Sequence, residues 1–294
     1  MEPVPESPAA APEPVGPALY AAAALVGFAA NSLLCRAALG AHRIDAASFT
    51  SIRLGTGALM LSLLAWRDPT LRARKDRTAA GSWRSAAALF AYAAAFSFAY
   101  LRLSAGAGAL ILFAAVQATM IGWGLAVGHE RPRLREWLGM IVALTGIAVL
   151  AAPGLSAHDP IGIGLMVLAG MAWGLYSLRG RKAAHPLATT AANFVRGAPL
   201  ALLMSLLFWS RAHASPGGMA LAAASGGVAS GIGYSLWYAA LRHISATRAA
   251  IVQLSVPVVA AVGGIVLLGE PLTLRLAVAA LAIVAGVGMA LSRR

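Results

Sequence analysis

The feature that most constrains this chain is a succession of long apolar stretches separated by short basic connections. A helix that crosses a bilayer needs about 20 largely apolar residues. Only 11% of the residues are charged and 60% are hydrophobic, whereas an average soluble domain has roughly 25% charged residues. We therefore expect an all-α polytopic membrane protein with ten transmembrane helices. The expected spans are 17–37, 46–66, 84–102, 104–127, 135–152, 160–179, 187–209, 217–241, 247–268 and 272–291.

Composition and charge exclude several other classes of protein. The single cysteine, Cys35, rules out a disulfide scaffold. The net charge of +13 does not indicate a nucleic-acid partner, because the basic residues lie between apolar runs rather than on one soluble face. Residues 1–16 are rich in proline and lack Lys and Arg, so we expect a disordered tail there rather than a secretory signal.

The distribution of Lys and Arg predicts the orientation in the membrane. Of the 23 basic residues, sixteen lie in one alternating set of connections and at the C-terminus, and five lie in the other set. Cytoplasmic connections are the ones enriched in Lys and Arg. We expect a bacterial inner-membrane protein with both termini in the cytoplasm, whose basic face contacts anionic lipid headgroups.

The second half of the chain repeats the first. The stretch SIRLGTGALMLSLLAW at 51–66 aligns with FVRGAPLALLMSLLFW at 194–209, which pairs Arg53 with Arg196. The stretch FSFAY at 96–100 aligns with YSLWY at 234–238. We expect one repeat over residues 17–152 and another over 160–291, each with five helices. Because five is odd, the two repeats cross the membrane in opposite senses, as in many secondary transporters.

Two stretches carry a resemblance to a known family. GHERPRLREWLGMIVALTGIAVL at 128–150 and LLGEPLTLRLAVAALAIVAGVGMAL at 267–291 resemble the closing segment of an EamA domain. The chain is thereby similar to the drug/metabolite transporter superfamily and, within it, to aromatic amino-acid exporters of the YddG type. The resemblance implies a basket of ten helices around a cavity that is lined chiefly by helices 1, 3, 4, 6, 8 and 9.

Candidate residues for that cavity are aromatic or polar side chains inside the expected spans. Aromatic rings can stack on a planar solute or hold a cation, or they can pack in the core. The aromatic candidates are Phe28, Phe96, Tyr100, Trp173, Tyr176, Tyr234, Trp237 and Tyr238. Amides and hydroxyls can bind both ends of an amino acid, or they can join helices. The polar candidates are Asn31, Ser32, Gln117, Ser177, Gln253 and Ser255.

Two further groups of residues bear on charge and on motion. Arg53 and Arg196 are the basic residues inside spans, and each either pairs with a substrate carboxylate or caps backbone carbonyls. Because both repeats carry one, the structural role is favoured. A hinge role, or close packing alone, is expected at a small set of glycines and one proline: Gly106, Gly108, Gly231, Gly233 and Pro257.

These observations predict a secondary transporter that works by alternating access. Since no Asp, Glu or Lys lies deep in a span, a buried carboxylate relay, a metal site and an enzymatic site are not expected, nor is a cofactor. The preferred solutes are neutral or aromatic amino acids, exported by a protein that can act as a monomer. Export of lipophilic cations or other metabolites is an alternative, and a membrane scaffold without solute flux is another.

Overall fold

The computed structural model describes residues 16–39, 41–72, 81–103, 105–129, 131–151, 159–268 and 274–291. The expected N-terminal tail, residues 1–16, lies outside this part of the chain except for Gly16. The helices are α1 (Pro17–Leu39), α2 (Ala46–Arg67), α3 (Pro69–Arg72), α4 (Trp83–Ala99), α5 (Ala105–Ala126), α6 (Leu134–Ala151), α7 (Pro160–Gly180), α8 (Pro186–Leu207), η3 (Trp209–Arg211), α9 (Pro216–Ala224), η4 (Ser225–Ile232), α10 (Gly233–Leu241), α11 (Ala246–Gln253), α12 (Val256–Leu268) and α13 (Leu274–Leu291).

The ten predicted spans each coincide with a helix or with consecutive helical segments. The helices begin where the sequence supplies a side chain that accepts a hydrogen bond from a free backbone N–H. Asp45 accepts from Ser48 at the start of α2, Ser82 accepts from Ser85 at the start of α4, and Asp159 accepts from Gly162 at the start of α7. Between the described helices there is no strand, and the one isolated β-bridge joins Ile44 to Ala214.

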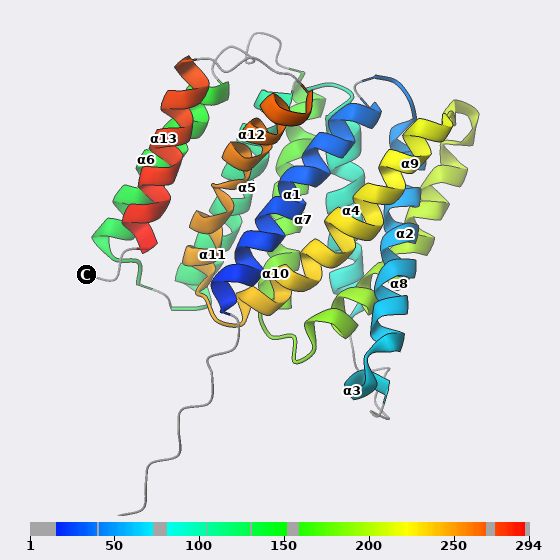
Figure 1. The fold of residues 1–294 in the computed structure, drawn as a ribbon, viewed down its shortest axis with the longest axis horizontal. Helices are drawn as coiled ribbons and strands as arrows, with labels where there is room; N and C mark the ends of the chain where they lie inside the picture. Colours follow the sequence, from blue (N-terminus) through cyan, green and yellow to red (C-terminus); the bar gives the residue numbers. More distant parts are fainter. Residues whose placement is uncertain are drawn as a thin grey trace, which may run out of the picture.

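The helices form one bundle with a paired arrangement (Figure 1). The pair α6 and α13 lies at one edge, the pair α2 and α8 lies at the other, and the remaining long helices lie between them. The contacts repeat with a twofold pattern. Helix α7 packs on α4 and α5, and its repeat counterpart α1 packs on α10 and α12, which are the counterparts of α4 and α5. This pattern is what two inverted five-helix repeats require.

The eighth and ninth spans are helical but not regular. The eighth consists of α9, a π-helical segment η4 and α10, and the i→i+5 hydrogen bonds of η4 make its turns wider than those of an α-helix. The ninth is interrupted at Leu254 and Ser255, and α12 starts at the next residue. Pro257 therefore lies in the first turn of α12, where its missing N–H leaves no unfilled hydrogen bond, rather than inside a continuous helix as the sequence suggested.

The outer surface of the bundle is apolar. Large side chains such as Leu59, Leu202 and Leu206 are exposed, whereas much of the interior is filled by alanine. A soluble protein rarely leaves such a surface in water. Five helical segments are long and apolar enough to cross a bilayer, and shorter apolar helices accompany them. The chain is a multi-pass membrane protein.

Small residues allow α6 and α13 to touch through their backbones. A Cβ atom added at Gly286 would overlap the carbonyl oxygen of Gly139 and would lie 2.7 Å from the backbone nitrogen of Ala143. Gly288, on the same helix, has nothing within 4 Å of the position of a Cβ atom. Contacts of this kind between small residues are a principal source of helix association in membranes.

We expect Gly286→Ala to destabilise the protein by about 1–3 kcal/mol, because the methyl group must push two backbones apart. The matched variant Gly288→Ala should leave stability unchanged or raise it slightly, since alanine favours helix. Thermal unfolding of the purified protein in detergent, followed with a thiol-reactive dye on the buried Cys35, measures both. Equal unfolding temperatures for the two variants would contradict this account of the contact.

Candidate functional site

The predicted aromatic residues of both repeats meet in one cluster at the centre of the bundle. The Trp173 ring lies 4.6 Å from the Tyr234 ring, 5.0 Å from the Tyr92 ring and 5.1 Å from the Phe28 ring, measured between centroids. Phe28 is half-buried and the other three are buried. Rings 4.5–7 Å apart attract each other beyond the burial of their area. The cluster therefore joins helices α1, α4, α7 and α10.

Hydrogen bonds fix the orientation of several of these rings. The indole N–H of Trp173 donates to Oε1 of Gln253 at 2.6 Å. The indole N–H of Trp237 donates to the Ser177 hydroxyl at 3.1 Å. The hydroxyl of Tyr238 donates to the carbonyl oxygen of Tyr176 at 3.0 Å. In a membrane interior each such donor needs a partner, so polar candidates from the sequence serve here as partners of the aromatic ones.

Arg53 lies at one side of this cluster and is 1% exposed. Its Nε–H donates to the Ser230 hydroxyl at 2.9 Å, and its Nη2 donates to the hydroxyls of Tyr234 at 2.5 Å and Tyr92 at 3.4 Å. Its Cζ lies 5.4 Å from the centre of the Tyr92 ring and 5.8 Å from that of Phe96. The guanidinium is thus held by neutral hydroxyls and aromatic rings.

Arg196, the repeat counterpart of Arg53, has a different environment. It is half-buried, and its Nη1 donates to the carbonyl oxygen of Ala192, one turn earlier in α8, at 2.9 Å. Its guanidinium also lies next to Gly81, at the start of α4. The same role was predicted for both arginines. In the structure the guanidinium of Arg53 is buried, whereas that of Arg196 lines an open cavity.

The other predicted residues are placed as follows. Asn31 is buried and its Oδ1 accepts from the hydroxyls of Ser225 and Ser230. Gln117 is buried beside α11, with Nε2 3.5 Å from the carbonyl oxygen of Ala250. Ser32 donates to Phe28 in its own helix, Tyr100 packs on Phe96 at the end of α4, and Ser255 lies at the break before α12.

The glycines predicted as hinges lie at two places. Gly231 is in the π-helical segment and Gly233 begins α10. Gly106 and Gly108 are in the first turns of α5, and their surroundings lie outside the described part of the chain. Whether any of these residues acts as a hinge stays a prediction.

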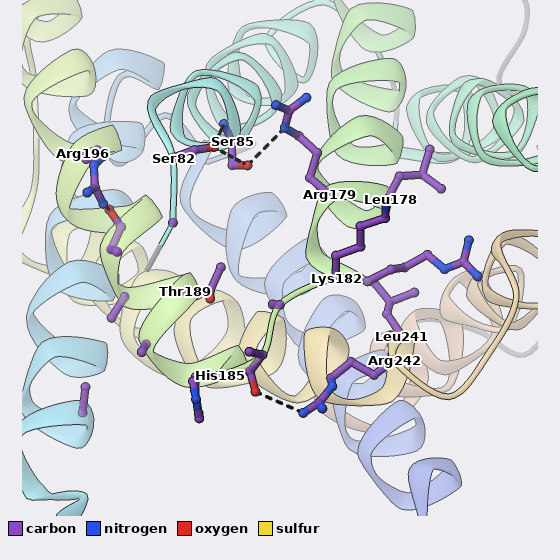
Figure 2. A pocket seen from close by; sticks show the side chains of 18 of the residues that line it. Ser82, Ser85, Leu178, Arg179, Lys182, His185, Thr189, Arg196, Leu241 and Arg242 are labelled. Carbon is purple, nitrogen blue, oxygen red and sulfur yellow. Dashed lines mark hydrogen bonds between the residues drawn. The ribbon is translucent and has the colours of Figure 1, made fainter. Parts of the chain in front are cut away.

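A cavity of about 1420 Å³ lies at one end of the bundle. Its walls come from four of the connections that the sequence marks as rich in arginine, together with the adjoining ends of α2, α4, α5, α7, α8 and α10. Among the residues that the structure describes, five cationic side chains line it, Arg179, Arg181, Lys182, Arg196 and Arg242, and no acidic one does. Figure 2 shows Arg179, Arg196 and Arg242 on different sides of this space.

The floor of the cavity adjoins the aromatic cluster. Leu178 and Leu241 line the cavity, and they lie one turn or less from Tyr176 and Tyr238. The Tyr238 ring packs directly on Gly180, where a Cβ atom would overlap the ring. Of the predicted site residues, Arg196 is the one found in the described lining of this space, and the aromatic candidates lie in the cluster beneath it.

At the opposite end of the bundle, polar contacts connect the ends of neighbouring helices. Arg102, after α4, forms a salt bridge of 2.7 Å with Asp159 at the start of α7. Hydrogen bonds from the N–H of Gly162 and from Arg102 hold the pKa of Asp159 below its usual value. Burial of Asp45 acts to raise its pKa, but hydrogen bonds from Ser48 and His213 outweigh this and lower it. Both carboxylates therefore remain ionised at neutral pH.

Comparison with known proteins decides the family. The model of the EamA-like transporter family matches residues 16–152 and, a second time, residues 160–292. The chain belongs to the EamA-like transporter family. It is 51% identical over 271 residues to the uncharacterized protein PA1977 of Pseudomonas aeruginosa. The matched stretch covers 92% of this chain and 93% of that protein.

Two further likenesses agree with this family. A protein of Archaeoglobus fulgidus described as an uncharacterized transporter is 31% identical over 155 residues, or 50% of this chain and 54% of that one. A protein of known crystal structure superimposes with a TM-score of 0.76 over 94% of this chain and 99% of that chain, at 19% identity, and so shares its fold. As a member of the EamA-like family the protein is a membrane transporter of small molecules.

Sequence reasoning missed three residues of this transporter's centre. Tyr92 contacts Arg53, Trp173 and Tyr234. Its position was detectable in the sequence, because Tyr92, Phe96 and Tyr100 are spaced four residues apart and so share one face of α4. Ser230 and Phe194 also contact the cluster. Nothing in their local sequence distinguishes them from ordinary helix-packing residues.

Two buried glutamines of the EamA bundle provide a test of its hydrogen bonding. Gln253→Leu should lower the free energy of unfolding by about 1–3 kcal/mol, because the indole N–H of Trp173 loses its buried acceptor. Gln117→Leu should cost less, since Oε1 of Gln117 has no partner among the described residues. Thermal unfolding in detergent compares them. A larger loss for Gln117→Leu would show that Gln253 is not the amide that supports the cluster.

Proposed function

We propose that this protein is a secondary transporter that exports small carboxylate-bearing metabolites, with neutral and aromatic amino acids as the first candidates. It works by alternating access in the bacterial inner membrane, with both termini and the arginine-rich end in the cytoplasm. The functional unit is a monomer whose apolar surface contacts membrane lipids. No cofactor takes part.

The observation that carries this proposal is the charge of the cavity. A cavity whose described lining holds five cationic side chains and no acidic one attracts an anionic group and repels a cation. The aromatic cluster beneath its floor supports a solute that also has an apolar or aromatic part. Together these favour a solute with a carboxylate at one end and an apolar group at the other.

Export of lipophilic cations is the second candidate, and the aromatic cluster is what favours it. Rings of Tyr and Trp can hold a cation over their faces. Arg53, however, already places a positive charge against the rings of Tyr92 and Phe96, and a second cation there would be repelled. A scaffold without solute flux would leave the open, charged cavity unexplained.

Alternating access is supported by the fact that one end of the helix bundle is open and the other is closed. The arginine-rich end holds the cavity, whereas the other end is held by the Arg102–Asp159 salt bridge and by the contact of Ile44 with Ala214. Because the repeats are inverted, exchange of their conformations would close the first end and open the second. The salt bridge is then one of the contacts that breaks in each cycle.

The proposed function predicts the solutes that move. In proteoliposomes, we expect efflux of L-phenylalanine, L-tryptophan, L-threonine or L-methionine down a gradient, several-fold faster than efflux of phenethylamine or tryptamine. Protein-free liposomes correct for passive leakage of the amines. Movement of the amines alone would establish the cation exporter instead, and absence of any protein-dependent flux would remove transport of these solutes.

The salt bridge can be weakened without loss of the helix start, since asparagine caps a helix as well as aspartate does. Asp159→Asn should therefore shift the equilibrium toward the state that is open at the Asp159 end by about two- to fivefold, because an exposed ion pair contributes only modestly. The measurement is the rate at which an impermeant maleimide labels Thr189→Cys, a cavity position, in a Cys35→Ala background.

We expect slower labelling in the Asp159→Asn variant. Acid should act in the same direction. The interaction is complete above the usual aspartate pKa of about 3.9 and is lost as the pH falls through the lowered pKa of the folded state. Faster labelling in Asp159→Asn would contradict the assignment of this salt bridge to the closed end.

A further inference from the structure

The guanidinium of Arg53 has donors that the protein does not use. Its Nη1 is buried and has no hydrogen-bond partner among the described residues. The partners of Nε and Nη2 are the hydroxyls of Ser230, Tyr234 and Tyr92. Arg53 lies eight residues into α2, roughly 12 Å from the start of the helix at 1.5 Å per residue, and so well inside the span.

A buried cation of this kind is costly unless it is paired. Charged side chains within membrane spans pair with each other or mark the path of a substrate or ion. Hydroxyl oxygens offset part of the lost hydration but supply no opposite charge. The hydrogen bonds around Arg53 therefore leave room for one interaction that the protein itself does not supply, namely with an anion.

The surroundings of Arg53 indicate what kind of anion fits. The rings of Tyr92 and Phe96 lie against the guanidinium and present an apolar surface, and Tyr234 reaches it with its hydroxyl. Ser230, which accepts from Arg53, also donates to Oδ1 of Asn31 at 3.5 Å. That amide oxygen also accepts from Ser225, so Asn31 holds Ser230 in place beside the guanidinium. An inorganic anion would leave the two rings without an apolar partner, whereas a carboxylate with an apolar group would contact them.

We propose that Arg53 binds the carboxylate of the transported solute, in a buried site that Tyr92, Phe96, Ser230 and Tyr234 form with it. The ligand has one carboxylate and an apolar or aromatic group. This inference rests on the proposed function and gives its substrate site a location and a charged residue. In the present conformation the tyrosine hydroxyls occupy Nη2, which the carboxylate takes together with Nη1 when the ligand binds.

A route from the cavity to this site runs along the aromatic cluster. Tyr238 packs on Tyr176 at 5.0 Å, and Tyr176 lies 6.2 Å from Tyr234, the partner of Arg53. The hydroxyl of Tyr176 and Nδ2 of Asn193 are buried without partners among the described residues. Polar atoms of this kind can hydrogen-bond a polar ligand as it passes between rings. The ring contacts have to open for the ligand to reach Arg53.

Equilibrium binding to the purified full-length protein tests this assignment. The probes are tritiated L-phenylalanine, with unlabelled 3-phenylpropionate and phenethylamine as competitors that keep or lack the carboxylate. Arg53→Gln should weaken the binding of both carboxylates by roughly 10- to 100-fold and leave that of phenethylamine unchanged. Arg196→Gln should weaken them less, and Arg211→Gln, at the opposite end and exposed, should change nothing.

A second variant keeps the test decisive if Arg53→Gln does not fold. Tyr234→Phe removes one hydroxyl that competes with the ligand for Nη2, so it should bind L-phenylalanine roughly three- to tenfold more tightly. A merely structural Arg53 would give unchanged or weaker binding. Folding of each variant is checked by its unfolding temperature.

The outcomes separate this inference from the proposed function. If the wild-type protein binds and transports carboxylates but folded Arg53→Gln keeps the same preference over phenethylamine, Arg53 is not the anchor and the proposed function stands. Equal losses in Arg53→Gln and Arg196→Gln would also overturn the assignment. If the wild-type protein neither binds nor transports these carboxylates, the proposed function fails, and the inference fails with it.

Discussion

The hydrogen bonds of the buried Arg53 guanidinium are the interaction on which the centre of this bundle depends. They join α2 and α4 of the first repeat to η4 and α10 of the second. A cation held at this depth must be surrounded by oriented oxygen atoms, because the membrane interior supplies no water. Ser230 in the π-helical segment and Tyr234 in α10 supply two of these oxygen atoms.

The two repeats supply the same fold but not the same centre. Where the first repeat has Tyr92 and Phe96, the aligned positions of the second have Ser230 and Tyr234. All four surround Arg53 rather than Arg196. An inverted duplication begins with two equivalent sites, and here substitution has left one guanidinium buried and the other on a cavity wall. The difference leaves one buried guanidinium at the centre of the bundle, and the substrate site that we propose is built on it.

Hydrophobic periodicity and charge position were sufficient to predict the helices, because span length and the exclusion of charge are direct demands of the bilayer. They could not predict the irregular eighth and ninth spans. The π-helical segment depends on close packing of glycines: a Cβ atom at Gly226 would overlap the carbonyl oxygen of Arg53, a contact between residues far apart in sequence. The aromatic residues were predicted together, as the lining of a cavity. In the structure they form a closed cluster instead, because their rings pack against each other.

Because Arg53 and Arg196 occupy equivalent positions in the two repeats, the sequence favours a structural role for both. Equivalent positions, however, do not ensure equivalent surroundings. Symmetry of sequence sets the position of a residue on its helix but does not determine the neighbours that the other repeat presents to it. Arg53 faces hydroxyls and rings, whereas Arg196 bonds its own helix at Ala192. The bond of Arg196 to its own helix therefore does not make it a second copy of the Arg53 environment. Arg53 is held by three other helical segments, and its Nη1 has no partner among the described residues, which is why we assign the ligand to it.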